Sequence, residues 1–229
     1  MDAHHLPPLA SNRDEVRRLS QRLYDHAMQH QDQGVLVAAQ TYLGLAHYSD
    51  GRFDLAEQAL TDAIERYDPV AHAHHAAEFG FDTRVWATTG RALVRWFTGH
   101  DEAARADATN AVRWAREMSH IPSLSMALLY QSLGHQARGD KARALVSTGE
   151  LLGITARYGL PAFTGYAAII RCWASGSVDE IAGATARCRR CGAWAAATAR
   201  ATTAPSPPRR WPPASAGTRP SNASTTACA

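Results

Sequence analysis

The apolar residues between positions 13 and about 182 recur at spacings of three and four, which is the period of an amphipathic helix. Alternation with a period of two, which would indicate strands, is scarce over the same range. Three stripes of this kind follow one another: Val16, Leu19, Leu23 and Ala27; Leu36, Ala39, Leu43 and Ala46; Leu55, Ala59, Ala63 and Tyr67. The pattern predicts an all-α region of about eight antiparallel helices.

Glycine or proline stands at every break between these segments. We expect glycine to end helices in the left-handed conformation and proline to end or open them. The breaks fall at Gln33-Gly34, Asp50-Gly51, Asp68-Pro69, Gly99-His100, Ile121-Pro122, Gly139-Asp140, Leu160-Pro161 and Ser175-Gly176.

Three of these turns repeat one another, because alanine follows glycine after five residues in each. The pairs are Gly51 with Ala56, Gly99 with Ala104, and Gly139 with Ala144, and a weaker copy begins at Gly176. The intervals between the glycines lie in the range of helix-pair repeats. A small residue after the turn lets the second helix approach the first closely, so the sequence predicts a solenoid of antiparallel helix pairs over residues 13–182.

The residues support a family resemblance as well. Leu43, Gly44, Gly51, Ala56, Leu60 and Ala63 resemble the tetratricopeptide consensus at its small and apolar positions. A longer resemblance covers about residues 13–176 and rests on Tyr67-Asp68-Pro69 with His72, Phe79-Gly80-Phe81-Asp82, Ala103-Ala104 and Ile170-Arg171-Cys172-Trp173-Ala174. This order resembles the C-terminal tetratricopeptide-like repeat region of bacterial proteins that join an adenylate or guanylate cyclase domain to a predicted ATPase domain. The resemblance implies a tetratricopeptide-like α-solenoid and a place in signalling.

Neither catalytic part of such proteins has its motif here. The sequence contains no Gly-x-x-x-x-Gly-Lys-Ser/Thr phosphate loop, no paired metal-binding aspartates of a cyclase and no nucleophile elbow. Ser119-His120 and scattered acids such as Asp101 and Glu117 are accounted for as helix caps and solvated faces. We therefore expect a protein that is not an enzyme and that has no cofactor.

Two groups of side chains have the spacing of metal ligands. Cys188 and Cys191 are separated by two residues, as in zinc sites and redox pairs, but no second pair completes a site. A second group, His72, His74 and His75 with Glu78, could present two or three ligands on one helical face. Nothing elsewhere in the sequence completes a tetrahedron, so we predict no metal site.

The net charge of +3 conceals a division within the chain. Glu180 is the last acidic residue and seven arginines follow it, so the part before it carries a net negative charge. Residues 183–229 are rich in Ala, Pro, Arg and Thr, and we expect them to be disordered, as we do residues 1–12. The loss of acids is also what GC-rich coding DNA read in a shifted frame would give, in which case the solenoid is truncated.

Two further features of the sequence indicate the compartment in which the protein is located. The chain has no run of about 18–20 apolar residues, and its first eleven residues lack the apolar core of a signal peptide. All four cysteines lie in the last third of the chain, which is no disulfide framework for the helical part. We expect a cytoplasmic protein that has no contact with membranes.

Large apolar residues recur at corresponding positions on the first helices of three repeats. On a solenoid these helices line the inner curve, where they would form an apolar groove for a protein or peptide partner. Burial of the same residues in the core is the alternative explanation. The candidate groove residues are Leu45, Tyr48, Trp86, Leu93, Trp96, Met126 and Leu129.

The leading functional hypothesis is a non-catalytic protein-interaction or regulatory repeat module. A truncated fragment without an independent function is the first alternative. The second is nucleic-acid binding through the basic tail, which the sparse arginines disfavour as the main role. An uncapped end of the solenoid would also permit self-association.

Overall fold

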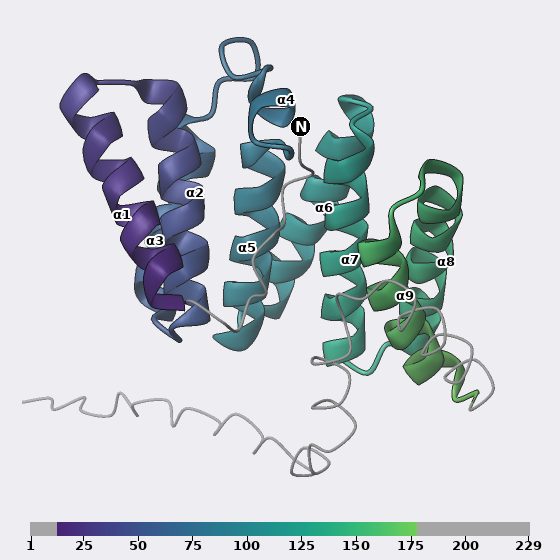
Figure 1. Cartoon of the computed structure of the whole chain (residues 1–229). Helices are drawn as coiled ribbons and strands as arrows, with labels where there is room; N and C mark the ends of the chain where they lie inside the picture. Colours follow the sequence, from purple (N-terminus) through teal and green to yellow (C-terminus); the bar gives the residue numbers. More distant parts are fainter. Residues whose placement is uncertain (1–12, 178–229) are drawn as a thin grey trace, which may run out of the picture.

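The computed structural model describes residues 13–177, and this part of the chain contains helices but no strand. Figure 1 shows the helices side by side, from α1 in purple to α9 in green. Within the described range no helix combines the length and the apolar character needed to cross a bilayer. The helices are α1 (Arg13–His30), α2 (Gln33–Ser49), α3 (Phe53–Arg66), α4 (His75–Glu78), α5 (Thr83–Phe97), α6 (Asp101–Glu117), α7 (Ile121–Ala137), α8 (Lys141–Tyr158) and α9 (Pro161–Ser175).

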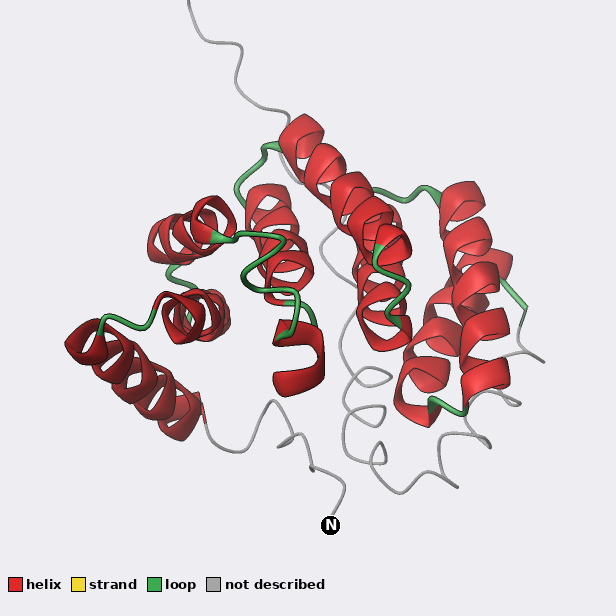
Figure 2. Cartoon of the chain, turned by 90° about the horizontal axis from the view of Figure 1, so that it is seen from above, coloured by secondary structure: helices red, strands yellow, loops and turns green. Residues whose placement is uncertain are grey.

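The long helices form two rows joined by short loops (Figure 2). In one row α2 contacts α5, α5 contacts α7, and α7 contacts α9. The helices α3, α6 and α8 pack against this row but contact one another weakly at most. Helices crowd together on the inside of a bend and separate on its outside, so α2, α5, α7 and α9 form the inner row of the array.

The helix boundaries follow the capping signals of the sequence. The glycines at positions 51, 99, 139 and 176 all have positive φ, between 70° and 84°, which confirms them as left-handed helix ends. At the other end, Asp32, Asp82 and Asp140 accept hydrogen bonds from the backbone N–H three residues on, at 2.9–3.1 Å, and so cap α2, α5 and α8.

The break predicted at Gln33-Gly34 is placed differently in the structure. α1 ends at His30, and Gln31 rather than glycine takes the left-handed conformation, with φ 54°. Because Asp32 caps the next helix, Gly34 lies in the first turn of α2. A Cβ at position 34 would stand 3.4 Å from Nε2 of His75, so glycine here leaves room for that ring.

The alanines of the repeated turns are buried within the helical array. Ala56, Ala104 and Ala144 are 0–3% exposed, which agrees with the predicted requirement for a small residue. Around Ala56 the approach is closest: Gly44 on α2 and Gly90 on α5 both face the fully buried Leu60. A Cβ at Gly44 would lie 2.6 Å from Cγ of Leu60.

A buried ion network ties three helices together. Asp107 on α6 accepts hydrogen bonds from Arg91 at 2.8 and 2.9 Å and from Arg95 at 3.0 Å, both on α5. Arg95 also donates to Glu57 on α3 at 2.8 Å, and Arg91 donates to Thr61 at 3.3 Å. The Asp107 side chain is 6% exposed, so its charge depends on these two guanidinium groups.

Two predictions about helices need correction. The apolar stripe of α1 is only partly covered, because α1 packs against α2 alone: Ala27 is buried, whereas Val16 and Leu19 are 39% and 49% exposed. About eight helices were predicted, and the described residues contain a ninth, the one-turn helix α4. Residues 1–12 and 178–229 lie outside the described range, and with them the expected disorder of both ends and the last residues of the predicted solenoid.

Candidate functional site

The seven candidate groove residues do not share one environment. Met126 and Leu129 on α7 are only 4% and 5% exposed, and Leu129 belongs to the main core cluster. We therefore remove these two from the candidate surface. Leu45 and Tyr48 on α2 are half-buried and pack against the smaller core cluster around Leu60.

The three candidates on α5 remain partly accessible. Trp86, Leu93 and Trp96 are half-buried, and seven residues, two helical turns, separate Trp86 from Leu93, so these two share one face of α5. The ring of Trp96 lies 4.6 Å from the ring of Phe97, which is 47% exposed. This face of α5 is apolar and partly accessible.

An aromatic chain, not anticipated from the sequence, runs from α2 to α9. The ring of Tyr42 on α2 meets Trp86 edge-on at 5.0 Å, and Trp86 lies 5.4 Å from Phe81, in the loop before α5. Phe81 in turn meets Phe163 of α9 edge-on at 6.5 Å. The four rings link helices that are far apart in the sequence, and Trp86 lies between Tyr42 and Phe81.

Three tyrosines add phenol groups to the inner row. They are Tyr48 on α2, Tyr130 on α7 and Tyr166 on α9. Burial, together with the neighbouring phenols of Tyr48 and Tyr166, raises the pKa of Tyr130 to about 12. The hydroxyls of Tyr48 and Tyr130 have no hydrogen-bond partner within residues 13–177, so both can bond a ligand.

The helical period of the sequence indicates some of the aromatic residues that were not predicted for this surface. Tyr130 lies four residues after Met126, and a helix brings residues at this spacing to one face. Tyr166 and Phe163 lie on α9, where no fourth repeat was aligned. The position of Phe81 depends on the path of an irregular loop, for which the local sequence carries no periodic signal.

The histidine group after α3 is divided between the core and the surface. His74 is exposed, with Nε2 3.4 Å from Glu78, whereas His72 and His75 are buried and their rings stack at 4.7 Å. Nδ1 of His75 lies 2.7 Å from Oγ1 of Thr83, and Nδ1 of His72 accepts a hydrogen bond from the backbone N–H of Asp68. Two of the three side chains therefore fix the loop that leads into α5.

The histidine group with Glu78 is not arranged as a metal site in the described structure. Residues 13–177 contain no group of three His, Cys, Asp or Glu side chains placed to hold an ion. Cys188 and Cys191 lie outside the described range, and Cys172 is buried within α9.

His75 is expected to make stability depend on pH. Burial, and to a smaller extent the neighbouring His72 and His74, lower its pKa from 6.5 to about 4. His75 thus binds a proton near pH 6.5 in the unfolded chain but only near pH 4 in the folded chain. The free energy of unfolding is therefore greatest above pH 6.5 and decreases as the pH falls from 6.5 towards 4. Urea unfolding should show a loss of about 1–2 kcal/mol between pH 7 and 5 that is attributable to His75.

The variant His75→Gln isolates this contribution. It is expected to flatten the pH dependence of the unfolding free energy by that amount. An equal slope in the His75→Gln variant and the wild type would contradict the assignment.

Similarity to known proteins is seen at the level of the fold. No protein-family model matches the sequence, and no curated protein matches it either. The structure is similar to a variant of the nearly identical TPR-like repeats of a kinesin light chain-like protein from Podosopora anserina, with a TM-score of 0.53 and 16% identity over 82% of this chain and 89% of the other. A second crystal structure of those repeats gives 0.51 and 15% identity over 83% and 96%. Residues 13–177 thus have the fold of a tetratricopeptide-like helical-repeat protein.

Proposed function

We propose that this chain is a non-catalytic protein-interaction module whose inner row of helices binds an extended or helical peptide segment of a partner. The observation that supports this most is the concentration of half-buried aromatic side chains on α2, α5, α7 and α9. Trp86 contacts the rings of Tyr42 and Phe81, and the phenols of Tyr48 and Tyr130 are without partners in the described part of the chain. Aromatic groups with a polar tip suit a peptide, because they cover apolar side chains and bond backbone groups.

A more specific role is suggested by the resemblance of the sequence to the repeat region of bacterial cyclase and ATPase proteins. We propose that the module belongs with bacterial cyclase and ATPase signalling proteins and acts in the cytoplasm, where it would sense or assemble and would not turn over nucleotides. Self-association through an end of the array is a further proposal of the same kind, supported by the exposed apolar side chains of α1, which are Val16, Leu19 and Met28. A fragment without an independent role, and a nucleic-acid-binding tail, are the alternative proposals.

Peptide selection on the full-length chain tests the proposal. Peptides from a random displayed library that bind the wild type are expected to lose at least about tenfold in affinity when Trp86 is replaced by leucine, because a central aromatic contact is worth about 2 kcal/mol. The double variant Tyr48→Phe/Tyr130→Phe, which keeps both rings, should lose less.

Tyr158 supplies the matched control. It is 48% exposed on α8, in the outer row, so Tyr158→Leu removes an aromatic ring of the surface away from the inner helices. Selected peptides should bind this variant as they bind the wild type, with an unchanged helical circular-dichroism signal in all variants. Peptides that bind the Trp86→Leu variant undiminished would place the interaction elsewhere and contradict the proposal.

A further inference from the structure

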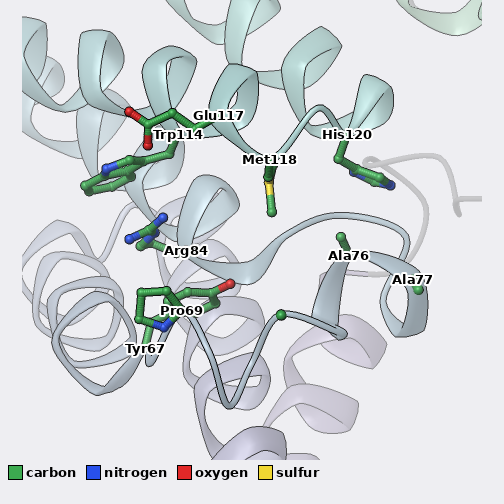
Figure 3. Close-up of a pocket in the computed structure, with 10 residues that line it drawn as sticks. Tyr67, Pro69, Ala76, Ala77, Arg84, Trp114, Glu117, Met118 and His120 are labelled. Carbon is green, nitrogen blue, oxygen red and sulfur yellow. The ribbon is translucent and has the colours of Figure 1, made fainter.

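A cavity lies on the face of α5 that is turned away from Trp86. It has a volume of about 510 Å³ and is bounded by the end of α3, the loop around α4, the start of α5 and the end of α6. Figure 3 shows Arg84 at one side of this cavity, with Met118 and His120 opposite Ala76 and Ala77. The walls that complete the cavity are mostly short apolar side chains, among them Pro69 and Ala73.

Arg84 is held between two aromatic rings. Its Cζ atom lies 4.2 Å from the centre of the Trp114 ring and 5.0 Å from the centre of the Tyr67 ring (Figure 3). Rings that cover the faces of a guanidinium leave its edge, with the N–H donors, open to a ligand in the same plane. The arrangement therefore presents a planar cation whose orientation is fixed in advance.

Hydrogen bonds fix the position of Tyr67, one of the two rings that enclose Arg84. The Tyr67 hydroxyl donates to Oδ2 of Asp82 at 2.5 Å, and the other carboxylate oxygen of Asp82 caps α5 by accepting from the backbone N–H of Val85 at 2.9 Å. The backbone N–H of Asp82 donates to Oγ of Ser123 on α7 at 2.9 Å. Burial and the Asp82 carboxylate raise the pKa of Tyr67, so the phenol keeps its proton and remains a donor.

Arg84 differs from the other two arginines on the same face of α5. Arg91 and Arg95 both pair with Asp107, whereas Arg84 has no ion-pair partner within residues 13–177, and its Nε atom is buried without a hydrogen bond. A buried donor without an acceptor costs about 1–3 kcal/mol, more for a charged group. An acceptor that enters the cavity would recover this energy.

We propose that this cavity binds a carboxylate group carried on a short aliphatic stem, with the carboxylate paired to Arg84 and the stem against the alanine and methionine wall. A single guanidinium matches the charge and geometry of one carboxylate, whereas a phosphate dianion is usually met by several cationic donors. Glu117 also lines the cavity, but Arg113 pairs with it at 2.8 Å and offsets its charge. Both a free organic acid and a glutamate side chain of a peptide have this chemistry.

The site is independent of the partner-binding face, since α5 separates the cavity from Trp86. Its test needs no protein partner. In titrations of the full-length chain, followed by NMR at the indole N–H of Trp114 and at Nε–H of Arg84, we expect saturable shifts with glutarate and with N-acetyl-glutamate methylamide. The neutral N-acetyl-glutamine methylamide and inorganic phosphate should give none.

Variants of the charged residues make the test specific. Arg84→Gln is expected to weaken carboxylate binding roughly ten- to a hundredfold, and Arg84→Lys less, because lysine keeps the charge and loses the two-pronged geometry. Glu117→Gln removes the competing carboxylate and should strengthen binding about two- to fivefold, a gain that misfolding cannot imitate. Arg143→Gln, at an exposed site on α8, is the control and should change nothing.

The outcomes decide both the site and the source of its ligand. Binding of glutarate alone identifies a free acid, and binding of the blocked glutamate identifies a peptide side chain; each supports the proposal. Absence of saturable shifts with both probes overturns it, as does equal binding of the glutamine compound or of phosphate. Should Arg84→Gln fail to fold, weaker binding by Glu117→Gln than by the wild type overturns it too.

Discussion

Replacing Asp107 by alanine is expected to lower the free energy of unfolding by about 3–5 kcal/mol. Asp107 is the carboxylate shared by Arg91 and Arg95, and their side chains are only 13% and 22% exposed. Arg95 would retain Glu57, but Arg91 would retain only its 3.3 Å contact with the hydroxyl of Thr61. The cost is large because truncation leaves a largely buried guanidinium without a counter-charge.

Urea unfolding followed by circular dichroism measures this cost. The control is Glu150→Ala, which removes the carboxylate that Arg116 meets at 2.8 Å on the exposed surface between α6 and α8. Both of those side chains are more than a third exposed, so their pair is expected to contribute no more than about 1 kcal/mol. Similar losses from Asp107→Ala and Glu150→Ala would show that the network around Asp107 is not the tie between α3, α5 and α6 that its geometry indicates.

The sequence predicts the parts of this fold that depend on local chemistry. Turn glycines such as Gly51 and Gly139 were recognisable because a left-handed helix end favours a residue without Cβ. The alanines that follow were recognisable because close helix packing leaves little volume. The Asp107 network was not, since the residues that pair in it are separated by 12 to 38 residues of chain and nothing in the sequence around any one of them indicates its partner.

The local sequence also does not indicate which residues of the candidate sites are buried or which side chains they contact. Met126 and Leu129 were placed on the surface by aligning repeats, but α7 is apolar around most of its circumference, so its sequence does not indicate which face is buried. Arg84 was not singled out, because arginine near the start of a helix is unremarkable by itself. Its character depends on Tyr67 and Trp114, which only the folded chain brings to its two faces.

The second large effect on the free energy of unfolding is expected from substitutions at Leu60 and at the glycine beside it. Leu60 on α3 is fully buried and lies between Gly44 on α2 and Gly90 on α5. Leu60→Ala should cost about 2–5 kcal/mol of unfolding free energy, through lost burial and the cavity it leaves. Gly44→Ala should cost about 1–2 kcal/mol in the wild type, because its Cβ would lie 2.6 Å and 2.8 Å from Cγ and Cδ2 of Leu60, and that strain exceeds the helix propensity gained.

The two substitutions are expected to compensate each other. Removing Cγ and both Cδ atoms of Leu60 removes the two closest contacts of the new methyl group and leaves the carbonyl oxygen of Ala56 at 3.3 Å. Gly44→Ala introduced into the Leu60→Ala variant should therefore raise the unfolding free energy by up to about 1 kcal/mol instead of lowering it. Gly153→Ala on α8 is the control: a Cβ there meets nothing within 4 Å, so this substitution should stabilise both backgrounds by about 0.5–1 kcal/mol. A double-mutant cycle from urea unfolding measures the change of sign. If Gly44→Ala destabilises both backgrounds equally, its methyl group clashes with something other than Leu60, and the close packing of α2 on α3 has another cause.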